Sequence, residues 1–106
     1  MATMGERLII QVGSGYDAQV IREPSRIWVR LDTREPKRLI GFWSHSIQNE
    51  ADIEVLSVIL GWIRERAILA AKEGVRPLLA FQSAPPGWEF WPGVPEVIAR
   101  SLDGKG

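Results

Sequence analysis

His45 is the residue best suited to catalysis in this chain. It is the single histidine and lies between Ser44 and Ser46, just before a segment expected to be a helix. An imidazole can act as a general base or contact an anion near a helix N-terminus. No nucleophile stands at the spacing of a known catalytic motif relative to it, and one histidine without any cysteine does not make a convincing metal site. We therefore interpret His45 as a loop residue that hydrogen-bonds to the backbone.

The glycine-rich turn and the carboxylates match no catalytic motif either. Gly13-Ser14-Gly15 lacks the spacing of a nucleophile elbow, of a dinucleotide-binding loop and of a phosphate-binding loop, and favours a tight turn. Asp52 and Glu54 are two residues apart in the expected helix, so their side chains face different directions and do not form an acid–base pair. The sequence therefore predicts a protein that is not an enzyme and that has no metal and no cofactor.

Arginines around a tryptophan form the first candidate binding surface. The residues from position 26 to 31 alternate between polar and apolar, which places Arg26, Trp28 and Arg30 on one face of a strand. Rings that stack on bases and cations that track phosphates are typical of proteins that hold single-stranded nucleic acid. We keep this as the alternative function, with Arg38 as a further contact. The simpler interpretation, which a net charge of zero favours, is that solvated arginines cover Trp28 with their aliphatic stems.

The tryptophans form the second candidate surface. Trp88, Phe90 and Trp91 lie between two Pro-Gly pairs, and Trp62 lies on the apolar side of the expected helix. Half-covered aromatic rings are typical anchors of protein interfaces. The C-terminal cluster either docks onto its own sheet or packs against a second copy, and both alternatives stay open. We expect Trp62, Trp88, Phe90 and Trp91 to form the protein interface.

Four extended segments precede the helix. Branched and alternating residues predict strands at 7–12, 17–22, 26–31 and 38–43. Gly41 indicates a bulge or a close backbone approach. A fifth strand is expected at 76–81, where Pro77 restricts it to an edge or to a strand start. Strands that follow one another through short turns form an antiparallel meander, here of four to five strands.

One long helix follows these strands. Asn49 and the acidic residues after it favour a helix start, whereas Gly74 and Pro77 favour an end, which predicts a helix over residues 50–73. Its apolar arc is broader than one sheet can cover, so either the C-terminal segment or a partner must cover the rest. Pro95 and the apolar residues after it predict a short C-terminal helix.

A chain of 106 residues is expected to form one domain, since chains split into separate domains only when they are about twice as long or more. We expect a single α+β domain over residues 1–106, in which the long helix packs across one sheet face and residues 1–6 and 103–106 fray. No apolar run is long enough for a membrane span and the start does not resemble a signal peptide, so we expect a cytoplasmic protein. The expected function is a small non-enzymatic protein-binding module, homodimeric or bound to another protein, that uses the aromatic C-terminal segment and the broad helix face.

Overall fold

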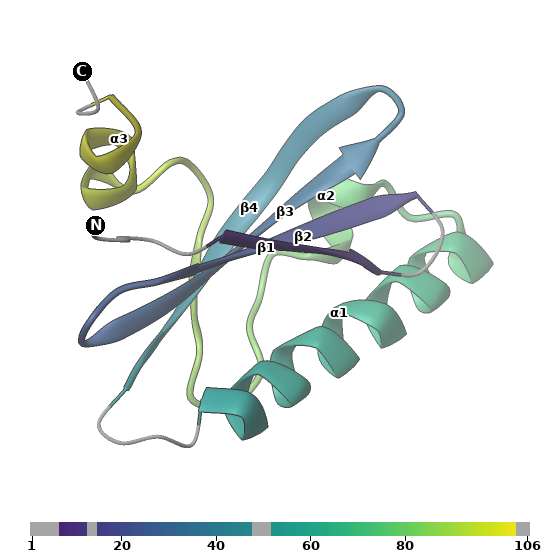
Figure 1. Cartoon of the computed structure of the whole chain (residues 1–106). Helices are drawn as coiled ribbons and strands as arrows, with labels where there is room; N and C mark the ends of the chain where they lie inside the picture. Colours follow the sequence, from purple (N-terminus) through teal and green to yellow (C-terminus); the bar gives the residue numbers. More distant parts are fainter. Residues whose placement is uncertain (1–6, 13–14, 48–51, 104–106) are drawn as a thin grey trace.

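The chain forms a five-stranded antiparallel sheet with helices on both faces (Figure 1). The structure is a computed structural model and describes residues 7–12, 15–47 and 52–103. The strands are neighbours in sequence order, namely β1 (Arg7–Val12), β2 (Tyr16–Arg22), β3 (Arg26–Arg34), β4 (Lys37–Ser46) and β5 (Glu89–Trp91). The helices are α1 (Asp52–Glu73), α2 (Pro77–Ala80) and α3 (Glu96–Asp103). The predicted α+β class and antiparallel meander are confirmed.

The alternation of β3 divides the sheet into two faces. Ile27, Val29 and Leu31 point to the face that α1 crosses, and all three are fully buried. Ile59 and Ile63 of α1, one helical turn apart, are buried against them. The larger hydrophobic core therefore lies between α1 and the sheet.

α1 is one uninterrupted helix, as the sequence predicts, and packs on one face of the sheet (Figure 1). It ends at Gly74, whose φ of +70° is the left-handed conformation that glycine commonly adopts after a helix. The N–H of Val75 donates to the Ala70 carbonyl (3.0 Å), which satisfies a terminal carbonyl of the helix. The expected cap, Asn49, lies outside the described residues. Among the helices that the structure describes, none has the length and apolar character needed to cross a membrane.

A smaller core lies on the face opposite α1, which we call the second face. Trp28 and Phe42 point to this face, and Ile98 of α3 packs on them together with Ile21. The strand face around Trp28 is therefore covered, because the chain returns after β5 and places α3 over it. The ends expected to fray, 1–6 and 103–106, lie outside the described residues except for Asp103, the last residue of α3.

The fifth strand is not at the expected position. Pro77–Ala80 form α2, because a proline in the first helical turn needs no N–H donor and already has a helical φ. The actual fifth strand, Glu89–Trp91, pairs antiparallel with the stretch of β4 from Phe42 to Ser44. Its formation depends on the free edge of β4, which no local sequence pattern reveals.

Gly41 has both of the roles that its position indicates. The register between β3 and β4 shifts opposite it, between Leu31 and Asp32, and its backbone lies against the ring of Phe90.

Strands β3 and β4 also extend further than predicted. The segment 32–37, which separates the two predicted strands, is therefore reduced to a tight turn, and residues up to Ser46 belong to the sheet.

Candidate binding pocket and apolar surface

A pocket of about 520 Å³ lies on the second face, where the turn between β2 and β3 meets β5 and the start of α3. Its walls are Glu23, Ser25, Arg26, Trp28, Trp91, Pro95, Glu96 and Val97. The volume and the combination of apolar walls with a few polar groups are typical of small-molecule sites. The fold thus brings two expected nucleic-acid contacts, Arg26 and Trp28, together with one expected interface residue, Trp91.

Ser44 orients two side chains of this pocket from inside the protein. Its hydroxyl is buried on β4, and Oγ accepts hydrogen bonds from Arg26 Nη1 (3.0 Å) and Trp91 Nε1 (3.2 Å). The indole of Trp91 also packs on Trp28, with 5.5 Å between ring centroids. Two donors on one buried hydroxyl fix the positions of the guanidinium and the indole relative to each other.

Trp28 forms the floor of the pocket, and only 2% of its surface is exposed. Its Nε1 donates to Glu23 Oε1 (3.1 Å), and the Arg26 guanidinium lies over its ring, 5.9 Å from the centroid. A nucleic-acid base needs a free ring face on which to stack. The structure therefore does not present Trp28 as the stacking platform that the nucleic-acid interpretation requires.

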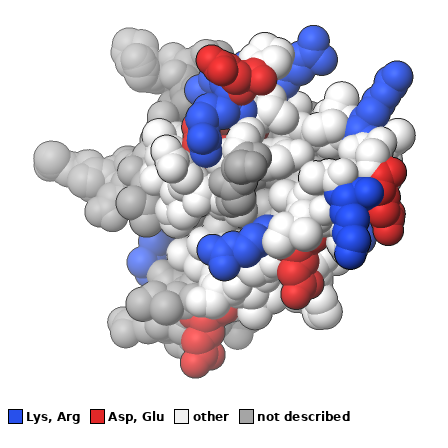
Figure 2. All heavy atoms as spheres, turned by 90° about the vertical axis from the view of Figure 1, so that its right-hand side faces the viewer, with Lys and Arg blue, Asp and Glu red and all other residues white. Residues whose placement is uncertain are grey.

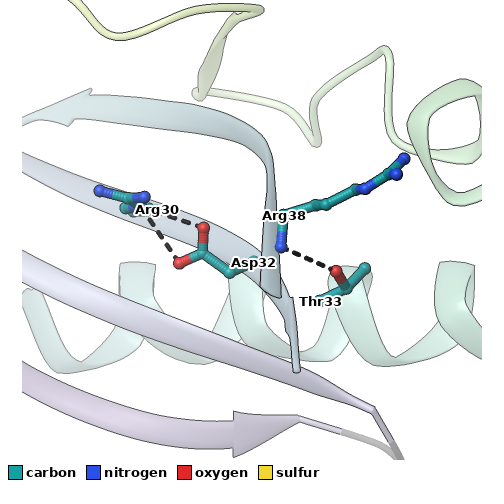
Figure 3. A network of polar contacts seen from close by, with 4 residues as sticks. All are labelled: Arg30, Asp32, Thr33 and Arg38. Atoms are coloured by element: carbon teal, nitrogen blue, oxygen red, sulfur yellow. Dashed lines mark hydrogen bonds and ion pairs between the residues drawn. The ribbon is translucent and has the colours of Figure 1, made fainter. Parts of the chain in front are cut away.

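Arg30 and Arg38, the other expected nucleic-acid contacts, do not line the pocket. Arg30 Nε donates to both carboxylate oxygens of Asp32 (3.2 and 3.1 Å), and its guanidinium lies over the ring of Phe42. Figure 3 shows the Arg38 side chain extending away from this ion pair, while its backbone N–H donates to Thr33 Oγ1 (3.0 Å). Of the four expected contacts, only Arg26 and Trp28 therefore share the pocket.

The four expected interface aromatics pack against their own chain. Trp88 is buried, while the rings of Phe90 and Trp62 contact Trp43 with centroid distances of 5.3 and 5.9 Å. Trp91 is half-buried in the pocket. These contacts agree with the first of the two alternatives for the C-terminal cluster, in which it docks onto its own sheet.

His45 lies on β4 and not in a loop. Its Nδ1 donates to the Ser46 carbonyl oxygen (2.6 Å), and its ring packs edge-on against Trp88, with centroids 5.1 Å apart. Ser14 lies outside the described residues. Within the ranges that the structure describes, no group of three or more His, Cys, Asp or Glu side chains could hold a metal ion. The described contacts of His45 are thus one hydrogen bond to the backbone and one ring contact.

Exposed aliphatic side chains at the end of α1 and on α2 form a second candidate site. This apolar surface consists of Ile68, Leu69, Val75, Leu78 and Leu79, each between 37% and 60% exposed. Three residues separate α2 from the end of α1 and the two helices are in contact, so both groups lie at the same end of the molecule. Figure 2, which faces this end of the molecule, shows wide uncharged areas with side chains of both charges among them. Clusters of exposed apolar side chains commonly mark interaction surfaces.

A groove of about 380 Å³ adjoins the apolar surface. Its walls include Tyr16, Ala67, Ile68 and Val75. Burial raises the pKa of the Tyr16 hydroxyl above its ordinary value of 10.0. The sequence pattern did not predict the apolar surface, because a strand at 76–81 would turn alternate side chains, and so either Leu78 or Leu79, towards the core. The available signal was a proline followed by two leucines, which is compatible with a helical turn.

No family model matches the chain, and no curated protein or solved structure is similar enough to match it.

Proposed function

We propose that the protein is a small non-enzymatic protein-binding module that forms a homodimer through its apolar surface. The observation that supports this proposal is the exposure of large aliphatic side chains on two adjoining helices. Removal of apolar surface from water is favourable by about 25 cal/mol per Å², and this gain opposes the loss of translational and rotational freedom on association. A partner over this surface would also supply the second cover that the broad apolar arc of α1 needs.

Aromatic residues support the apolar surface from within. Phe81 follows α2 directly and is fully buried, with its ring centroid 5.5 Å from that of Tyr16 and 6.3 Å from that of Trp43. These contacts anchor the end of α2 to the core, so that Leu78 and Leu79 remain on the outside. In this proposal the aromatic rings hold the surface in place and the aliphatic side chains make the contact.

A second copy is the partner that the charges around the surface favour. Lys72, Glu73 and Arg76 flank it, and all three are exposed. Because both signs of charge lie side by side, two copies related by a two-fold axis can each offer a carboxylate to the cations of the other. A partner with charge of one sign would meet repulsion as well as attraction at this rim.

Size-exclusion chromatography with light scattering tests the homodimer. We expect twice the mass of one chain, which is 11.9 kDa, at micromolar concentration. Leu79→Lys should produce monomers, because an ammonium within an apolar contact loses hydration without gaining a partner. A wild-type mass of one chain across the micromolar range would disprove the proposal.

Val94→Lys is the matched control. Val94 is also an exposed aliphatic residue, but it lies in the segment between β5 and α3, away from α1 and α2. We expect this variant to keep the mass of the wild type, and circular dichroism should show that both variants are folded. Dissociation by both substitutions would show that the apolar surface is not the contact.

A further inference from the structure

We propose that the pocket on the second face binds a small zwitterion with an apolar side chain, the chemical class of a free α-amino acid such as leucine or phenylalanine. The pocket and the apolar surface lie on opposite sides of the sheet. This proposal therefore does not depend on the homodimer.

Glu23 and Arg26 bring opposite charges to one indole without forming a direct ion pair with each other. Glu23 Oε1 lies at the edge of the Trp28 ring, where it accepts the Nε1 hydrogen bond (3.1 Å), whereas the Arg26 guanidinium lies over the face of the ring. Among the described residues neither forms an ion pair, although both are half-buried. A half-buried charge without a counter-ion has lost hydration that an oppositely charged ligand group can replace.

An ammonium and a carboxylate on the same carbon of a ligand match this arrangement. The ammonium would donate to the carboxylate of Glu23, which uses Oε1 for Trp28 and retains further lone pairs. The ligand carboxylate would accept from the N–H groups of Arg26 beyond the one that donates to Ser44. Charge-assisted hydrogen bonds of this kind are about twice as strong as neutral ones.

The remaining walls suit an apolar side chain. Trp91, Pro95 and Val97 line the same pocket, and the Trp91 ring is already fixed by its hydrogen bond to Ser44. A rigid, half-buried indole loses little conformational entropy when a ligand packs on it. The volume of about 520 Å³ lies towards the small end of the range for ligand pockets and suits a small molecule.

Ligands with a single kind of charge fit this pocket less well. A phosphate or a nucleic-acid strand would meet the carboxylate of Glu23, and a simple amine would meet the guanidinium of Arg26. Repulsion of this kind adds to specificity as much as attraction does. The pairing of charges thus favours a ligand that carries both.

Titration of the full-length, ¹⁵N-labelled protein tests the proposal through the indole N–H signals of Trp28 and Trp91. L-phenylalanine and L-leucine should each shift both signals saturably. 3-Phenylpropionate lacks the ammonium and 2-phenylethylamine lacks the carboxylate, so each should bind at least about ten-fold more weakly than phenylalanine. The proposal is overturned if neither amino acid causes a saturable shift, or if one of the singly charged probes binds as tightly as phenylalanine.

Glu23→Gln separates the charge of this residue from its structural role, because the amide oxygen can still accept the Trp28 hydrogen bond. We expect it to weaken phenylalanine binding about ten-fold and to leave 3-phenylpropionate binding no weaker than in the wild type. Glu89→Gln is the matched control, since Glu89 is an exposed carboxylate on β5 that does not line the pocket. Equal phenylalanine affinity of Glu23→Gln and wild type would overturn the proposal.

Discussion

Gly41 and Phe90 lie so close together that a Cβ at position 41 would be 2.5 Å from Phe90 Cε1. Phe90 belongs to β5, which has only three residues, and its ring also packs beside Trp43 with a centroid distance of 5.3 Å. A strand this short forms few ladder hydrogen bonds, so its position depends strongly on side-chain packing. The glycine on β4 therefore provides the space that allows the C-terminal segment to complete the sheet.

Gly41→Ala should destabilise the fold by about 1–3 kcal/mol, because the added methyl group must displace the Phe90 ring or the β5 backbone. Urea denaturation followed by circular dichroism measures the change. Gly61→Ala is the control, since a Cβ at this helical position meets nothing within 4 Å and should stabilise the protein by up to about 1 kcal/mol. An unchanged midpoint for Gly41→Ala would show that the ring moves aside freely.

Ser44→Ala should also cost about 1–3 kcal/mol, since it removes the acceptor of both Arg26 Nη1 and Trp91 Nε1. Denaturant titration gives the free energy, and faster hydrogen exchange of the Trp91 indole would locate the effect. Ser46→Ala on the same strand is exposed and should stay within about 0.5 kcal/mol of the wild type. Equal stability of the two variants would mean that these hydrogen bonds contribute nothing net.

Local patterns predicted the parts of the fold that local physics determines. The alternation of residues 26–31 is enough to predict a strand, and the capping signals around 50–73 are enough to predict a helix. Both elements lie nearly where they were expected. The helix at 77–80 and the strand at 89–91 depend on partners distant in sequence, namely the core beneath Phe81 and the open edge of β4. A pattern of hydrophobic residues within one segment does not carry that information.

The pocket could be predicted only in part, for a similar reason. Alternation correctly placed Arg26 and Trp28 on one face, but it does not show what covers that face. The cover is Ile98, which is 70 residues later in the chain than Trp28 and is buried on it. Trp91 lies on β5 and Glu23 lies in the turn between β2 and β3. They line the same pocket only because the tertiary fold brings these two segments together.

Trp91→Ala and Leu79→Ala should have opposite effects on stability and assembly. Trp91 packs on Trp28 within its own chain, so its loss should destabilise the fold by about 2 kcal/mol or more and leave the fraction of dimer in the folded protein unchanged. Leu79 is 60% exposed, so its truncation should change the unfolding of the monomer little and weaken the dimer at least several-fold. Analytical ultracentrifugation and denaturant titration of both variants measure the two effects. If folded Trp91→Ala protein dissociates into monomers, the Trp91 ring is part of the dimer interface.

Single-stranded oligonucleotides should not quench the fluorescence of Trp28. The ring is covered by α3 and by Arg26, and the nearby Arg30 is paired with Asp32. Titration of the wild type and of Trp28→Phe with a mixed-sequence oligonucleotide at low salt tests this, since low salt favours any phosphate contact. Quenching that weakens steeply with salt and disappears in Trp28→Phe would instead support the nucleic-acid alternative.

Tyr16 should make the protein less stable at high pH. Burial raises its folded-state pKa above 10.0, so the folded protein favours the neutral phenol, and this contribution to stability is complete below pH 10 and declines as the pH rises through the folded-state pKa. Because the chain has one tyrosine, the near-ultraviolet absorbance of tyrosinate reports this residue alone. We expect a midpoint above 10.0 in the folded protein and close to 10.0 in concentrated urea, and Tyr16→Phe should lose less stability than the wild type over the same interval. A folded-state midpoint at or below that of the unfolded chain would show that the hydroxyl is exposed to water.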